Sequence, residues 1–148
     1  MKKLIALVMS VILCVIAVGC YEDSSSAVDT AQARNIYTDE NISVDFVKIA
    51  NSIVSGNFEL YVKAQNKTEK DVTLMLKDVT INGSMVEVGS GVPCDIIAGA
   101  NRTHGFFGRL DLAGLTSAEE VTKITFKVWL VDENFSTIMT TQDLLIEI

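Results

Sequence analysis

Cys94 and His104 are the residues of this sequence best suited to nucleophilic chemistry. A thiol activated by an imidazole is the arrangement that cysteine nucleophiles need, and the two residues fall on neighbouring predicted segments that could meet across a hairpin. The chain has one His and three Cys in 148 residues. No third group at a recognisable spacing would orient the imidazole, and no Gly-x-Ser-x-Gly elbow offers a serine nucleophile. We therefore predict no catalytic residues, and a Cys94/His104 enzyme stands as the alternative.

Adjacent carboxylates occur at several points of the chain. Neighbouring residues of a strand point to opposite faces, so such pairs do not converge as the two acids of a glycosidase. None lies in an Asp-x-Asp-x-Asp-Gly calcium loop, and we interpret Asp132-Glu133-Asn134 as a solvated turn. One His and three Cys also cannot supply the four nitrogen and sulfur ligands of a zinc cluster. We expect no metal site and no cofactor.

Large apolar residues occupy both faces of two predicted strands. Phe106 and Phe107 are consecutive in one, and Trp129 alternates with the presumed core residues of the other. Such strands either lie inside a sandwich under covering loops or expose an aromatic patch to a protein or polysaccharide partner. We take Phe106, Phe107 and Trp129 as the candidate binding face.

The charge balance excludes one class of partner. The chain has 12 basic and 19 acidic residues and a formal charge of -7. Proteins that bind nucleic acid present clustered Lys and Arg, so we predict no nucleic-acid partner.

The N-terminus has the pattern of an export signal. Met1-Lys2-Lys3 precedes an apolar stretch from 4 to 18. As a helix this stretch would rise roughly 22 Å, short of the roughly 30 Å hydrocarbon core of a bilayer. A cleaved secretory signal is therefore favoured over a permanent span. Its removal takes Lys2 and Lys3, which leaves 10 basic against 19 acidic residues and a formal charge of -9.

Ala17-Val18-Gly19-Cys20 follows the apolar stretch directly and resembles a bacterial lipobox. In that motif small residues precede a Cys that is acylated and becomes the new N-terminus. The resemblance implies a signal peptide over 1–19 and lipid attachment, with palmitate-type acyl chains, at Cys20. It places the protein on the outer face of the bacterial cytoplasmic membrane. Cys94 would then be the one free thiol of the mature chain, without a disulfide partner.

The elements that would carry these residues are mostly strands. Residues 20–41 show no sustained period and are predicted to be a flexible tether. From Ile42 onward apolar and polar residues alternate, as in half-buried strands. Asn82-Gly83 predicts a tight hairpin, because both residues accept positive φ. A capping box over 116–120 predicts one short helical turn near 117–121.

Seven or eight short strands with almost no helix predict an all-β, immunoglobulin-like antiparallel β-sandwich over 42–148. Its strand ending in Ala64-Gln65-Asn66-Lys67-Thr68 and its hairpin at 78–83 resemble the telokin-type domains of small Gram-positive lipoproteins. That resemblance implies the same fold and adds little about activity.

Together these features predict a membrane-anchored, surface-displayed lipoprotein. We expect it to be a non-catalytic binding or assembly module of the bacterial cell envelope, with an envelope protein or polysaccharide as its partner. Two alternatives stay open: the Cys94/His104 enzyme, and a small-ligand binder with a pocket between the sheets.

Overall fold

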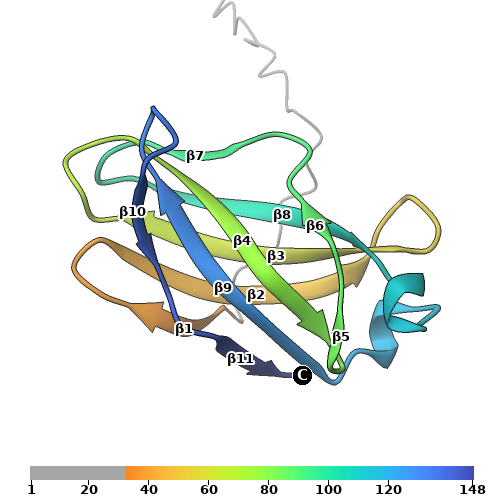
Figure 1. The fold of residues 1–148 in the computed structure, drawn as a ribbon. Coiled ribbons are helices and arrows are strands. Elements are labelled where there is room, and N and C mark those ends of the chain that lie inside the picture. Colours follow the sequence, from red (N-terminus) through yellow and green to blue (C-terminus); the bar gives the residue numbers. More distant parts are fainter. Residues whose placement is uncertain (1–32) are drawn as a thin grey trace, which may run out of the picture.

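Period-2 alternation from Ile42 onward produces two antiparallel sheets packed face to face (Figure 1). The structure is a computed structural model that describes residues 33–148. The predicted export signal, Cys20 and the first part of the predicted tether lie outside the described residues. Eleven strands occur in the described part: β1 (Arg34–Thr38), β2 (Ile42–Asn51), β3 (Asn57–Asn66), β4 (Val72–Ile81), β5 (Ser84–Met85), β6 (Val88–Gly89), β7 (Cys94–Ile96), β8 (Asn101–Arg109), β9 (Lys123–Val131), β10 (Thr137–Thr140) and β11 (Leu144–Glu147).

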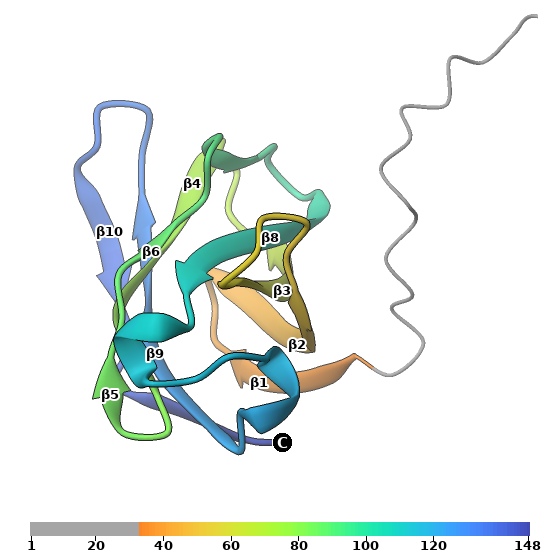
Figure 2. The same cartoon turned by 90° about the vertical axis from the view of Figure 1, so that its right-hand side faces the viewer.

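One sheet has the strand order β1-β2-β3-β8-β6, and we call it sheet A. The other, sheet B, has the order β10-β9-β4-β5, with β11 also pairing β9 and β7 also pairing β4. Two short 3-10 turns, η1 (Asp111–Ala113) and η2 (Ala118–Glu120), connect β8 of sheet A to β9 of sheet B (Figure 2). The all-β, immunoglobulin-like antiparallel sandwich predicted from the sequence is confirmed.

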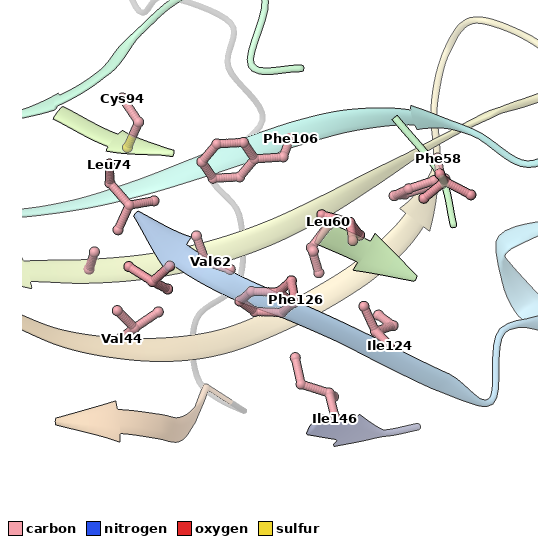
Figure 3. Close-up of a cluster of buried hydrophobic side chains, with 14 of the residues drawn as sticks. Val44, Phe58, Leu60, Val62, Leu74, Cys94, Phe106, Ile124, Phe126 and Ile146 are labelled. Atoms are coloured by element: carbon pink, nitrogen blue, oxygen red, sulfur yellow. The ribbon is translucent and has the colours of Figure 1, made fainter. Parts of the chain in front are cut away.

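The core lies between the sheets and is built by alternate residues of their central strands. In β3, for example, Phe58, Leu60, Val62 and Ala64 are buried, while the residues between them are half-buried on the outer face. Figure 3 shows the side chains of both sheets meeting in this layer. Each fully buried Phe, Leu or Val side chain contributes about 1.5–3 kcal/mol, so this layer is the main source of stability.

The predicted turns are confirmed. Asn82 and Gly83 have φ values of 50° and 88°, and the hairpin they form pairs β4 with β5. At η2 the Ser117 hydroxyl accepts a hydrogen bond from the Glu119 amide, and the Glu120 carboxylate accepts one from the Ser117 amide at 2.8 Å. The hairpin and the capped turn are each formed by residues a few positions apart, and so are the sequence patterns that predict them.

The folded region begins earlier than predicted. Strand β1 pairs with β2 at Tyr37 and Val44, and the Asn35 amide donates to Asp45 Oδ1 at 2.8 Å. The predicted tether over 20–41 is therefore wrong at its C-terminal end. A bulge between Asn35 and Tyr37 breaks the alternation of this short strand, which hid it from a periodicity argument.

The number of strands is also larger than predicted, because β1 is added before Ile42 and because one edge segment is divided in three. Strand β5 pairs with β4 through Met85 and Thr80, and β7 pairs with β4 through Cys94 and Leu74. Between them the chain leaves sheet B, and β6 pairs with β8 of sheet A at Val88. We call residues 86–93, which leave sheet B and return to it, the crossover segment.

Gly108 of β8 allows the crossover segment to approach sheet A. It lies opposite Val88 of β6 and Phe58 of β3. A Cβ atom at Gly108 would collide with the ring of Phe58 and would lie 3.2 Å from the Glu87 carbonyl oxygen. The absence of a side chain here therefore accommodates both a core aromatic ring and the backbone of the crossover segment.

Replacing Gly108 by alanine should lower the free energy of unfolding by about 1–3 kcal/mol, because the added methyl group overpacks the core against Phe58. Urea unfolding followed by circular dichroism measures this loss. Gly105→Ala in the same strand is the matched control. Its Cβ would lie 3.1 Å from Cε1 of the half-buried Tyr61 on the outer face, a milder contact than the collision with Phe58 in the core. Equal losses for the two variants would contradict this account.

Candidate functional site

A groove lies between the middle of β4 and the crossover segment, and we call it the crossover groove. It has a volume of about 410 Å³, within the range of roughly 300–1,000 Å³ that ligand sites occupy. Phe106, a buried residue of β8, lies at the groove. The remaining lining residues come from β4, β9 and the segment from β6 to β7: Thr73, Leu74, Met75, Leu76, Lys77, Val88, Gly89, Ser90, Gly91, Val92, Pro93, Cys94 and Trp129.

The edge of β4 that faces the groove has no pairing strand along its middle among the eleven described strands. On the groove side, β7 pairs with β4 over Val72–Leu74 and β5 pairs with it over Thr80–Ile81. On the opposite side β9 pairs with β4 through the middle as well. Within residues 33–148, no strand pairs with Met75–Lys77 from the groove side. An unpaired edge of this kind is a template for another strand.

The crossover segment does not close this gap itself. If the β4–β7 register continued beyond Leu74 and Cys94, Pro93 would lie opposite Met75. Pairing with β4 ends at Cys94, before Pro93. Gly91 then turns the chain away with a φ of 65°. The gap in the edge of sheet B thus follows from the path of the crossover segment.

Lys77 carries the charge of the groove. Its ammonium lies 3.1 Å from the centroid of the Trp129 ring, close enough for a cation–π interaction. The indole is held in turn, because Trp129 Nε1 donates to Thr137 Oγ1 at 2.9 Å.

The acidic residues near this strand are directed elsewhere. Lys127 forms ion pairs with Asp78 at 2.7 Å and with Asp143 at 3.8 Å. Its ammonium lowers the pKa of the Asp78 carboxyl, first through their hydrogen bond and then through its charge. None of the ion pairs within the described part of the chain includes Lys77. The groove therefore presents a cation without a carboxylate partner, on a chain whose overall charge is negative.

The three residues of the predicted binding face do not form one exposed cluster. Phe106 and Phe107 are consecutive in β8, so their side chains point to opposite faces; Phe106 is 2% exposed and Phe107 is 40% exposed. Trp129 is half-buried on β9 of the other sheet. Phe106 belongs to the core (Figure 3) and reaches the crossover groove from inside, whereas Trp129 lines the same groove. Phe107 borders a separate, more open hollow that also includes Met85.

Cys94 is a core residue. It is 1% exposed and lies beside Leu74, to which its strand is paired (Figure 3). Burial raises the pKa of its thiol to about 11. A thiol with this pKa is protonated at neutral pH and is a weak nucleophile.

His104 faces the core from the other sheet. Its ring meets Phe106 edge to face, with the ring centroids 5.0 Å apart. Burial, and then the positive charge of Arg102, lower the pKa of His104 below its ordinary value, so the imidazole is neutral at pH 7. His104 Nε2 is buried without a hydrogen-bond partner. Because Cys94 belongs to sheet B and His104 to sheet A, they are not cross-strand neighbours, and no described hydrogen bond joins them.

The described residues offer neither a metal site nor a membrane-spanning helix. Residues 33–148 contain no group of three or more His, Cys, Asp or Glu side chains that could hold a metal ion. No helix in that region is long and apolar enough to cross a membrane. Asp132, the first residue of the acidic turn Asp132-Glu133-Asn134, accepts hydrogen bonds from the amides of Asn134 and Ser136 and so closes that turn.

Comparison with known proteins gives solved structures of low sequence identity. No protein-family model matches the sequence, and no curated protein matches it either. The GAE domain of GGA2p from Saccharomyces cerevisiae aligns over 78% of this chain and 96% of its own, at 12% identity and a TM-score of 0.43. A FixG-related protein from Vibrio parahaemolyticus aligns over 74% of this chain and 97% of its own, at 14% identity and a TM-score of 0.39. Chicken MD-1, complexed with lipid IVa, aligns at 14% identity and a TM-score of 0.30, over 78% of this chain and 96% of its own.

The strand order and pairing define the class of this protein as an immunoglobulin-like β-sandwich. Sequence reasoning found Phe106 and Trp129 but missed Lys77 and the free edge of β4. Pro93, directly before a short apolar strand, was the local signal for an interrupted edge. Nothing in the sequence indicated which strand that interruption would expose.

Cys94 should react slowly with thiol reagents in the folded protein. In a chain carrying Cys14→Ala and Cys20→Ala it is the one remaining thiol. A rise in pKa from 9.0 to about 11 lowers the thiolate fraction at pH 8 by about 100-fold. We therefore expect modification by a chromogenic disulfide reagent to be at least about 100-fold slower in buffer than in 8 M urea. Adding Val92→Cys, at a position that is 59% exposed, should introduce one fast thiol. Rapid modification of Cys94 in the folded state would instead support the enzyme alternative.

Proposed function

We propose that this protein is a lipid-anchored, surface-displayed binding module of the bacterial cell envelope and that the crossover groove is its binding site. The observation that carries the proposal is the combination found at that groove. A free stretch of β4, an apolar wall with Phe106 at its base, and the unpaired cation of Lys77 converge on one cavity. Binding sites typically join an apolar cavity to a few polar groups that orient the ligand.

The N-terminal sequence supports the anchor. The apolar stretch ends at Ala17-Val18-Gly19-Cys20, where small residues precede the cysteine. A diacylglyceryl group at Cys20 would supply more than one acyl chain, which durable membrane attachment requires. At a charge of -9 the mature chain is repelled by anionic lipid, so the acyl chains would have to hold it.

The start of β1 at Arg34 shortens the connection between Cys20 and the folded region. Fourteen residue steps separate the two positions, and they span at most roughly 46–50 Å when fully extended. The groove would therefore be presented within a few nanometres of the membrane, where the accessible partners are other components of the envelope. A non-catalytic role agrees with the protonated, buried thiol of Cys94.

A small-ligand binder is the second candidate function. The volume of about 410 Å³ supports it, because cavities of this size accommodate small molecules. A macromolecular partner is favoured by the unpaired backbone of β4, since a small apolar ligand leaves the hydrogen-bonding groups of a strand edge unused.

Replacing Cys20 by alanine should release the protein from membranes, because it removes the acyl chains while leaving the folded region intact. Detergent phase partition measures this. The wild type is expected in the detergent phase and the Cys20→Ala variant, with its export signal cleaved, in the aqueous phase. A Cys94→Ala variant is the matched control and should partition like the wild type. Retention of Cys20→Ala in the detergent phase would contradict the anchor.

A photoreactive side chain at Val92 should cross-link the displayed protein to its partner in the cells that produce it. Val92 is 59% exposed and lines the groove. Leu145 is the matched control, because it is 52% exposed in β11, on the opposite side of β9 from β4. We expect a covalent adduct of defined mass at position 92 in a yield at least about fivefold higher than at position 145. Equal yields at both positions, or no adduct at either, would contradict the groove as the binding site.

A further inference from the structure

We infer that the crossover groove binds an extended polypeptide segment that adds as a short strand to the free middle of β4 and places a carboxylate beside Lys77. The inference rests on the proposed function, because it names the class of partner and the way in which that partner would bind at the same site.

The geometry of the sheet edge selects a strand as the occupant. Strands β5 and β7 both run antiparallel to β4 and pair with its two ends. The interval between these pairings covers Met75–Val79, and the Val79 carbonyl already accepts a hydrogen bond from the Val86 amide at 2.9 Å. Asp78 has a φ of 52° and lies in the register shift between Lys77 and Thr80, so it does not continue the extended strand. The free extended part is therefore Met75–Lys77, about 10 Å long at roughly 3.3 Å per residue. It accommodates about three residues of a partner chain between the end of β7 and the start of β5.

The two faces of β4 set the pattern of side chains in that partner. Leu74 and Leu76 point inward, and both line the groove together with Phe106. An added strand would place every second side chain toward this apolar wall. Those inward residues must be apolar, because a charged group there would lose its hydration without gaining a partner.

The outward positions face a different surface. Met75, Lys77 and Trp129 lie on the outer side of sheet B, with Met75 opposite Trp129 in the β4–β9 register. The ammonium of Lys77 is the one charged group that lines the groove. On an antiparallel pair, opposite charges that face each other across the strands attract. The partner strand is therefore expected to alternate apolar residues with acidic ones.

A phosphate or other small anion satisfies only part of this site. Val128, opposite Leu76 in the β4–β9 register, uses its amide and its carbonyl on Thr141, so the amide and carbonyl of Leu76 are the ones that face the groove. A small anion would meet the charge of Lys77 but would leave these two groups and the apolar wall without a partner. Strand addition pairs the backbone, fills the apolar space and meets the charge in a single binding mode.

Trp129 provides the assay, because it is the one tryptophan in the sequence and it lines the groove. The protein is the full chain carrying Cys20→Ala. The probe is a blocked hexapeptide of alternating valine and glutamate. Its comparators are the valine–lysine hexapeptide and the valine–glutamate hexapeptide with every amide N-methylated. Trp129 fluorescence is titrated with each peptide, and amide shifts at 75–77 are followed by NMR.

We expect saturable binding of the valine–glutamate peptide, with shifts at the amides of Met75–Lys77. The valine–lysine and N-methylated peptides should each bind at least about tenfold more weakly. Lys77→Glu should reverse the preference between the two charged peptides, and Lys77→Gln should abolish it. Lys63→Glu makes the same change of charge on β3 of sheet A and should leave the affinities within about twofold.

The possible failures separate this inference from the proposed function. Equal binding of the N-methylated peptide would overturn strand addition while leaving a groove that binds apolar ligands. Absence of peptide binding would overturn the inference even if the photoreactive group at Val92 still forms its adduct, and the binding function would then stand. Absence of both peptide binding and the adduct would overturn both.

Discussion

One constraint shapes this molecule: residues 84–96 must pair with two sheets in turn. Strands β5 and β7 pair with β4 of sheet B, while β6 between them pairs with β8 of sheet A. The close approach of β6 depends on Gly108, because a side chain there would collide with Phe58 in the core. The excursion ties the edges of the two sheets together and also leaves the middle of β4 without a partner. The stability of the sandwich and its candidate binding site therefore have the same structural origin.

A hydrogen-bond network around the buried Asn66 holds the β7 end of the groove in place. Asn66, at the end of β3 in sheet A, is fully buried, and its amide donates to the carbonyls of Lys70 at 2.7 Å and of Ile96 at 3.0 Å. Its Oδ1 atom accepts from both the amide and the hydroxyl of Thr68. Since a buried amide needs partners for its donors and acceptor, this network defines the turn from β3 to β4 and joins it to β7. The β7 end of the groove thus lies next to a fully hydrogen-bonded turn.

The side chains with the most reactive chemistry in the sequence are used as packing residues, and the candidate site is built from others. Burial raises the pKa of the Cys94 thiol and lowers that of the His104 imidazole, so that both groups are neutral at pH 7. Lys77 lies against the ring of Trp129 at the groove. A free strand edge with an adjacent cation recognises a partner through backbone pairing and charge, and neither requires an activated nucleophile.

The sequence by itself determined the features of the fold that depend on residues close together in the chain. Alternation specified the central strands and their core faces, Asn82-Gly83 specified a hairpin, and Ser117 with Glu120 specified a capped turn, since each signal acts within a few residues. The prediction of an anchor at Cys20 likewise rests on a linear motif alone. Only the tertiary structure decided that Phe106 is buried, that Cys94 and His104 belong to different sheets, and that the middle of β4 is unpaired. Strand pairing joins residues far apart in the chain, so which edge remains free is a property of the assembled sheets.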